Sequence, residues 1–297
     1  MSLKTLLQLA KKLPPIPAAI VCPESPVALT GTIMAAKQKS IIPTLIGDPT
    51  KIKKVAQAIN QDISAYQLIA ATTDASSIAA KLAYNNQVEL IVKGSLHTDD
   101  FMRALVKTIR TKNRMSHCQI LSVPTYKKLL ILTDAALNTF PTFIEKQAIV
   151  QNAITLAKKL GIPKPKVALL SAVETINPHI PNTIECKKLC KSLAKDGIIV
   201  GPISLDLAVS EQAVKIKNFS APVAGNADIL VVPNIEVGNV LLKALDCLAK
   251  ASSLGYVAGA KVPIVLTSRA TTAEIRADSC MLAKFIHKSP KLSLQQN

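Results

Sequence analysis

Near the C-terminus a hydroxyl and a guanidinium stand next to each other, at Ser268 and Arg269. They follow the apolar run VPIVL, residues 262–266, and precede a stretch with helical patterning. A guanidinium beside a hydroxyl at the end of a buried strand is suited to holding a phosphate or stabilising a developing oxyanion. The segment therefore predicts an anion-handling site after this strand.

The same segment also fits a helix cap. Thr271 or Thr272 can cap the helix that follows, and Glu274 stands three residues after Thr271, which is the spacing of a capping box. A cap leaves Arg269 without a role, so both interpretations stay open on the residues alone.

A second polar segment, KGSLHTDDFMRAL, follows the apolar residues 88–92. Gly94 predicts a turn and Asp99 onward a helix, whose N-terminus offers unpaired N–H groups and a positive dipole end to an anion. Four side chains can add donors to this anion seat: Lys93, His97, Thr98 and Arg103. Taken alone, the residues favour the simpler alternative, a helix cap by Thr98 or Asp99.

Several common site motifs do not occur in the sequence. There is no GxxxxGK[ST] phosphate loop, no GxGxxG dinucleotide fingerprint and no GxSxG nucleophile elbow. The four histidines lack metal-ligand spacing. Cys186 and Cys190 lack the second ligand pair that zinc needs, so they are predicted to pack on a helix.

Short apolar runs alternate with longer helical patterns, which favours an α/β fold of parallel strands joined by crossover helices. Functional groups of such folds gather beyond the carboxyl ends of the strands. Polar clusters follow five of the apolar runs: Lys93-Gly94-Ser95, Thr133-Asp134, Ser171-Ala172-Val173-Glu174, Pro233-Asn234 and Ser268-Arg269.

Two α/β domains are expected. The segment LNTFPT, which ends at residue 142, interrupts the pattern, and a return crossing is expected near residues 255–261. These boundaries predict a first domain of residues 1–139 and 262–297 and an inserted second domain of residues 140–261.

The composition describes a large folded chain with excess positive charge. Its 297 residues are 49% hydrophobic, and 36 basic against 19 acidic residues give a formal net charge of +17, which attracts anions. A nucleic-acid binder is one explanation, but aromatic residues are only 3% and lysine supplies most of the charge. A solvated lysine-rich surface is favoured, and no nucleic-acid partner is expected.

Six scattered cysteines in a lysine-rich chain indicate reduced thiols and a cytoplasmic protein. The apolar N-terminal stretch is too short for a signal peptide, and no window reaches the ~18 uninterrupted apolar residues of a membrane span. We therefore expect no membrane association.

Several long segments together resemble the phosphate acyltransferases, most closely the phosphate butyryltransferase branch. In chain order they include LLILTDAALNTFPTFIEKQAIVQNAI, PKVALLSAVETIN, GPISLDLAVS, VAGNADILVVPNIEVGNVLLKAL and GAKVPIVLTSRA, and VKGSLHT extends the match. The resemblance implies reversible transfer of a short-chain acyl group between coenzyme A and inorganic phosphate, with no tightly bound cofactor and no covalent enzyme intermediate. It also implies homo-oligomers of two α/β domains, isocitrate/isopropylmalate-dehydrogenase-like, with the site in a cleft between the domains.

Residue roles follow from the same resemblance. Ser268 should hydrogen-bond the reacting centre and Arg269 should hold phosphate, and Glu274 is the nearest surviving carboxylate for a thiol base. The matching motifs make further residues candidates for binding acyl-CoA, phosphate or acyl phosphate: Lys93, His97, Thr98, Arg103, Asp134, Asn138, Ser171, Asn239, Lys243 and Lys261.

The chain departs from the family pattern at three positions. Butyryl-type relatives often carry acidic residues where this chain has Thr271 and Val200, and acetyl-type relatives use an aspartate as thiol base at the position of Ile275. A catalytically weakened coenzyme A or acyl-phosphate binding protein is therefore the alternative. A decarboxylating dehydrogenase is disfavoured because it needs clustered aspartates for Mg²⁺, and the aspartates here stand in separate motifs.

Overall fold

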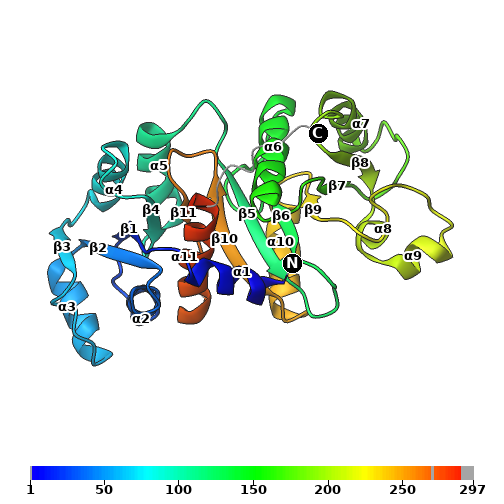
Figure 1. Ribbon diagram of the computed structural model, residues 1–297. Coiled ribbons are helices and arrows are strands. Elements are labelled where there is room, and N and C mark those ends of the chain that lie inside the picture. The colour runs from blue at the N-terminus through cyan, green and yellow to red at the C-terminus, as the bar shows by residue number, and fades with distance from the viewer. Residues whose placement is uncertain (1, 269–270, 289–297) are drawn as a thin grey trace, which may run out of the picture. The chain divides into compact units, whose positions relative to one another are not determined.

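The computed structural model describes residues 2–268 and 271–288 (Figure 1). The described chain divides into a discontinuous unit, residues 4–115 and 254–288, and a central unit, residues 116–253. The central unit begins and ends earlier than the predicted inserted domain of residues 140–261. The N-terminal boundary differs because residues 116–139 contain two strands, and the second of these pairs with a later strand of the central unit.

In the discontinuous unit the strands of the described chain run in the order β3-β2-β1-β4-β11-β10. Neighbours are parallel except for β10, which is antiparallel to β11. The strands are β1 Ile16–Val21, β2 Ile41–Gly47, β3 Gln67–Ala70, β4 Leu90–Lys93, β10 Ser252–Ala258 and β11 Ile264–Val265.

Helices cover both faces of this sheet. They are α1 Leu3–Lys11, α2 Pro26–Lys37, α3 Pro49–Ala58, α4 Ala75–Tyr84, α5 Thr98–Ile109 and α11 Ala273–Lys288. Two of them begin with proline after a capping residue: the Ser25 side chain accepts from the Ala28 N–H, and the Asp48 side chain accepts from the N–H groups of Thr50 and Lys51. Helices α2 and α11 pack against each other, as do α4 and α5.

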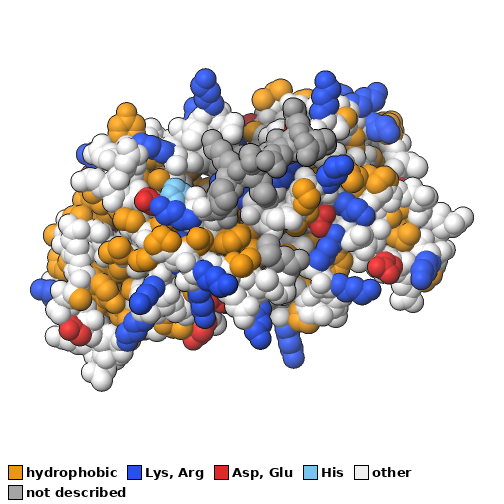
Figure 2. Space-filling model, in the orientation of Figure 1, with side chains coloured by type: hydrophobic (Ala, Val, Ile, Leu, Met, Phe, Trp, Pro, Cys, Tyr) orange, Lys and Arg blue, Asp and Glu red, His pale blue; other side chains and the backbone are white. Residues whose placement is uncertain are grey.

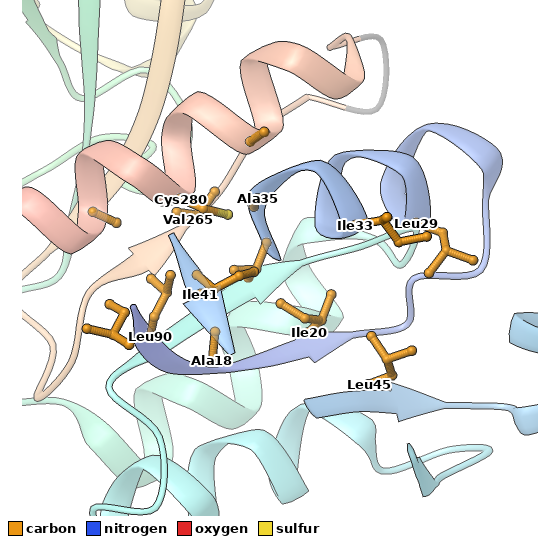
Figure 3. Close-up of a cluster of buried hydrophobic side chains, with 14 of the residues drawn as sticks. Ala18, Ile20, Leu29, Ile33, Ala35, Ile41, Leu45, Leu90, Val265 and Cys280 are labelled. Carbon is orange, nitrogen blue, oxygen red and sulfur yellow. The ribbon is translucent and has the colours of Figure 1, made fainter. Parts of the chain in front are cut away.

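The core of the discontinuous unit lies between the sheet and helices α2, α3 and α11. Alternate residues of each strand point to this side, as the period of a β-strand requires. Figure 3 shows side chains from β1, β2, β4 and β11 meeting those of α2 and α11, among them Ala18, Ile20, Leu45, Leu90, Val265, Leu29, Ile33 and Cys280. Each buried Leu or Ile stabilises the fold by about 1.5–3 kcal/mol.

The strands of the central unit run in the order β5-β6-β9-β7-β8. Strand β5 is antiparallel to β6, and the other neighbours are parallel. The strands are β5 Ser116–Ser122, β6 Leu130–Thr133, β7 Lys166–Leu170, β8 Ile198–Ile203 and β9 Ile229–Val231. The helices are α6 Phe143–Lys159, α7 Pro181–Ser192, α8 Leu205–Val209, α9 Glu211–Ile216 and α10 Ile235–Cys247.

The structure confirms an α/β fold and corrects one detail of the prediction. The sequence indicated parallel strands joined by crossover helices, and most neighbours are parallel, but β5 and β10 are antiparallel to their neighbours β6 and β11. Among the described residues, none of the helices has the length and apolar character that crossing a membrane requires. Figure 2 shows Lys and Arg side chains scattered over the visible face among hydrophobic and uncharged ones.

Candidate active site

The carboxyl ends of β1 and β4 lie side by side in the discontinuous unit, where the strand order reverses. The turn after β4 packs on the end of β1: the Gly94 N–H donates to the Val21 carbonyl at 2.8 Å and the Ser95 N–H to the Cys22 carbonyl at 2.8 Å. A Cβ at Gly94 would stand 2.1 Å from the Cys22 carbonyl oxygen, so only glycine fits here. In α/β sheets this reversal point is where ligands bind.

Arg276 connects this turn with the end of β11. From the first turn of α11 its Nη1 donates to the Lys93 carbonyl at 3.3 Å, and its Nη2 donates to the Ser268 carbonyl at 2.8 Å. The side chain is 5% exposed. The structure therefore brings together the main chains of Lys93 and Ser268, two predicted site residues that are far apart in the sequence.

Sequence reasoning assigned no role to Arg276. The sequence offered one indication of a role: Arg276 is a basic residue on the apolar face of a helix. It shares this face with Cys280 and Ala283, which are part of the core. A charge at such a position needs polar partners, and here strand-end carbonyls supply them.

The predicted reacting groups differ in exposure. Ser268 is exposed and Lys93 is buried, and Arg269 lies outside the described residues. Two further hydroxyls follow the same pair of strands, Ser95 after β4 and Thr267 after β11. Their oxygens are buried and have no hydrogen-bond partner in the described part of the chain, which makes them candidates for contact with a ligand.

Helix α5 begins at this edge, and its cap differs from the expected one. Neither Thr98 nor Asp99 caps it; His97 occupies the N-cap position without a side-chain hydrogen bond. Arg103, exposed on the second turn, lines a cavity of about 430 Å³ together with Cys22 and Leu96. The predicted donors therefore lie close together beside the strand reversal, His97 at the N-cap of α5 and Thr98 and Arg103 in its first two turns.

The cap of α11 also differs from the capping box predicted between Thr271 and Glu274. The Thr272 hydroxyl accepts from the Ile275 N–H at 3.4 Å, so the helix end is capped without Ser268. Glu274 is exposed, and hydrogen bonds from its own N–H and from Thr272 lower the pKa of its carboxyl. A lowered pKa makes Glu274 a weaker base, which counts against it as the acceptor of a thiol proton.

Cys22 directly follows β1 at this edge. Its burial, and then the neighbouring Glu24 carboxylate, raise the pKa of the thiol to about 11. A thiol with this pKa is protonated at neutral pH and is a poor nucleophile. The residue thus gives no support to a covalent enzyme intermediate.

In the central unit, Asp134 follows β6 and is 4% exposed. Its Oδ1 accepts from the N–H groups of Ala136 and Leu137, each at 3.0 Å, and its Oδ2 accepts from the His117 N–H at 3.0 Å and from Asn138 Nδ2 at 2.5 Å. Four donors saturate a carboxylate. The contacts indicate that Asp134 fixes the loop after β6 and orients Asn138.

Helix α10 begins against this loop. Asn239 Nδ2 donates to the Ala135 carbonyl at 3.3 Å, and a Cβ at Gly238 would stand 2.6 Å from the Asp134 carbonyl oxygen. Asp134, Asn138 and Asn239 are therefore brought together, while Lys243 lies one turn further along α10 and is exposed.

Ser171 follows β7 at the same edge of the central sheet. Its N–H donates to the Ile203 carbonyl at 2.9 Å, and its hydroxyl oxygen is buried without a partner in the described chain. Ser204 stands at the equivalent position after β8, with its hydroxyl close to the Asp206 carboxylate. This serine is a candidate that sequence reasoning missed, because the polar residue after β8 was not among the five clusters.

Lys261 does not lie beside Ser268, although the two share a sequence motif. It precedes β11 instead of following it, its N–H donates to the Ile109 carbonyl at 2.9 Å, and its Nζ donates to the Tyr84 carbonyl. Tyr84 and Ile109 end helices that run back from the carboxyl edge of the sheet. Lys261 therefore lies at the opposite edge from Ser268.

The prediction that Cys186 and Cys190 pack on a helix is confirmed. Both lie on α7, where Cys186 contacts the Leu169 carbonyl and Cys190 the Gly201 carbonyl. Within residues 2–268 and 271–288, no group of three His, Cys, Asp or Glu side chains could hold a metal ion.

Comparison with solved structures defines the class of protein. The fold matches the crystal structure of a branched-chain phosphotransacylase from Enterococcus faecalis V583 with a TM-score of 0.81 and 32% identity, covering 93% of this chain and 100% of the other. The protein thus has the α/β fold of a phosphotransacylase.

The sequence comparisons then show the family. Residues 70–283 match the model of the family described as "Phosphate acetyl/butaryl transferase". The chain is 42% identical to a phosphate acetyltransferase of Rickettsia prowazekii over 98% of this chain and 86% of the relative. It is 34% identical to a phosphate butyryltransferase of Clostridium beijerinckii over 95% and 96% of the two chains. The chain belongs to the phosphate acetyl/butyryl transferase family, and it is a transferase.

Proposed function

We propose that this protein catalyses the reversible transfer of a short-chain acyl group between coenzyme A and inorganic phosphate. One observation carries the proposal: the family match includes both Lys93 and Ser268, whose strand ends are held together by one buried arginine. The proposed substrates are acyl-CoA, phosphate and acyl phosphate, with no tightly bound cofactor.

The proposed reaction needs charge stabilisation more than a protein nucleophile. In the direction of acyl-CoA, the thiol of coenzyme A loses its proton to a base, its sulfur attacks the carbonyl carbon of acyl phosphate, and the C–O bond to phosphate breaks. Ser268 donates a hydrogen bond to the oxyanion of the tetrahedral intermediate, and Arg269 holds the departing phosphate. Because the pKa of Glu274 is lowered, Glu274 is a weak candidate for the base.

Arg103, Thr98 and His97 are proposed to hold phosphate groups of the substrates. They stand at the first turns of α5, where unpaired N–H groups and the helix dipole favour an anion, and Arg103 faces the cavity of about 430 Å³. Asp134, Asn138, Ser171, Asn239 and Lys243 form the second proposed group, in which Asp134 acts by orienting Asn138.

For Arg103→Ala we predict a higher KM for coenzyme A or phosphate with a smaller effect on kcat, because a contact present in both ground and transition states provides uniform binding. Lys107→Ala is the control, because Lys107 lines the same cavity. If it raises KM as much as Arg103→Ala does, positive charge in the cavity explains the binding without a specific contact from Arg103. Unchanged KM values for both substrates in Arg103→Ala would remove Arg103 from the site.

We also propose a domain architecture, a cellular location and an oligomeric state for the protein. The two-domain, isocitrate/isopropylmalate-dehydrogenase-like architecture is supported by the division of the chain into a discontinuous and a central unit. A cytoplasmic location is supported by six free cysteines. Assembly into homo-oligomers is supported by the exposed apolar residues of α10.

Phosphate-dependent release of free thiol from a panel of acyl-CoAs tests the function directly. Exposed Cys247 also reacts with thiol reagents, so the reaction without phosphate is the required blank. Release that needs phosphate and varies with acyl length supports the transferase. Binding of coenzyme A in calorimetry without any thiol release would favour the alternative, a catalytically weakened binding protein.

A further inference from the structure

Helix α11 carries two buried cations, Arg276 and Lys284, two turns apart on the same face. They are 5% and 0% exposed. In the described part of the chain neither pairs with a carboxylate, and each is bound by two main-chain carbonyls. Burial lowers the pKa of both groups, because desolvation disfavours their charged forms.

The two cations hold opposite edges of the same sheet. Lys284 Nζ donates to the Leu13 carbonyl at 3.1 Å and to the Lys39 carbonyl at 3.0 Å, just before β1 and β2 begin. Arg276 donates to the carbonyls of Lys93 and Ser268, where β4 and β11 have ended. One cation therefore lies at the amino edge and the other at the carboxyl edge, beside the proposed site.

The geometry of a guanidinium suits the position of Arg276 at the carboxyl edge. A guanidinium offers donors in a rigid planar fork, so two carbonyls bound to it are fixed in distance and direction, whereas an ammonium has no such fork. Helix α2 comes close to the base of this side chain, because a Cβ at Gly31 of α2 would stand 2.8 Å from Arg276 Cβ. The absence of a side chain at Gly31 lets the first turn of α11 approach α2.

We propose that Arg276 is a positioning residue for acyl transfer, which sets the Ser268 hydroxyl relative to the turn after β4. Lys284 is its structural counterpart at the edge that carries no chemistry. This inference rests on the proposed function, since it assigns Arg276 to the reaction that Ser268 serves. Arg276 acts through the two carbonyls and does not itself contact the reacting atoms.

Steady-state kinetics of Arg276→Lys, Arg276→Met and the matched control Lys284→Met test the inference. A displacement of about 1 Å in a reacting group costs on the order of 10²-fold in rate, so we expect Arg276→Met to lower kcat by about this factor, with KM values within roughly twofold. Arg276→Lys should recover only a small part of the loss. Lys284→Met should lower the melting temperature and leave kcat within about twofold of the wild type.

Equal losses of kcat in Arg276→Met and Lys284→Met would overturn the inference, as would full recovery of kcat by Arg276→Lys. If the Arg276 variants do not fold, Gly31→Ala replaces them, because it displaces the start of α11 without removing the guanidinium. It should lower kcat by a smaller factor, and an unchanged kcat in folded Gly31→Ala would then contradict the inference.

Hydrogen exchange provides a readout that does not depend on activity. Arg276→Met should speed exchange of the Gly94, Ser95 and Thr271 amides, and Lys284→Met that of the Ile16 and Ser40 amides, all of which are bonded to main-chain carbonyls. If wild-type protein releases no thiol from any acyl-CoA, the proposed function fails, and this pattern still decides whether the two cations hold separate edges. Identical exchange patterns in both variants would overturn the inference that Arg276 holds the carboxyl edge and Lys284 the amino edge.

Discussion

Ser268 could serve as a catalytic donor or as part of a helix cap, and the contacts around it favour the first role. Thr272 caps α11, so the Ser268 hydroxyl is not needed there. We predict that Ser268→Ala and Arg269→Lys each lower kcat by ~10²–10³-fold with little change in melting temperature, because each removes a donor to charge that develops in the transition state. Lysine retains the charge at position 269 but not the planar fork. Wild-type turnover in both variants would place the chemistry elsewhere.

The thiol of Cys22 should be dispensable. Since burial and Glu24 raise its pKa to about 11, it is protonated at neutral pH, and we predict that Cys22→Ser retains kcat within about threefold of the wild type. Iodoacetamide at pH 7 should modify exposed Cys247 first, and this should leave turnover intact. Loss of turnover on replacing Cys22, with the melting temperature unchanged, would revive a covalent mechanism.

At the scale of elements, the turn between β4 and α5 depends on the close approach of Gly94 to β1. We predict that Gly94→Ala destabilises the protein by about 3 kcal/mol, the upper end of the overpacking range, and abolishes most turnover because Ser95 and α5 move with the turn. The contacts at 2.1 Å and 2.4 Å are with main-chain oxygens, which cannot rotate away.

Gly197→Ala is the control, since its nearest contact would be the Pro165 carbonyl at 3.3 Å. Thermal unfolding and kinetics on the same samples separate the two effects. Equal stability of Gly94→Ala and Gly197→Ala would show that the turn can relax and that position 94 does not require glycine.

At the scale of the whole molecule, the exposed apolar side chains on α10 predict that the protein self-associates. Among its described residues only Gly238 is buried, while Val237 and Val240 are 42% and 69% exposed, and Leu248 just after the helix is 82% exposed. These positions recur at helical spacing, which makes an apolar stripe available to a second copy. We predict that Val240→Glu shifts the molar mass measured by light scattering towards one chain, with little change in melting temperature at low concentration.

Ile216→Glu, at an apolar position on α9 that is 76% exposed, should leave the mass unchanged. A wild-type protein of one chain in solution would contradict the proposed homo-oligomer. An equal effect of both variants would indicate general loss of apolar contact instead of a specific interface on α10.

The sequence by itself determined the α/β class, most of the strands and the polar residues at their ends. These features are local: apolar runs, turn residues and helix starts such as Ser25-Pro26 and Asp48-Pro49 are decided by neighbours in the chain. The long motifs also determined the family, because an ordered series of segments is specific where a single one is not.

Only the tertiary structure decided which of those residues meet. The sequence placed Lys261 with Ser268 because they share a motif, yet a strand lies between them and sends them to opposite edges of the sheet. It gave Arg276 no role, because the carbonyls that this side chain binds belong to residues 93 and 268, and their approach depends on the pairing of β4 with β11. Hydrogen bonds between such distant groups form only when the chain has folded, so no local pattern records them.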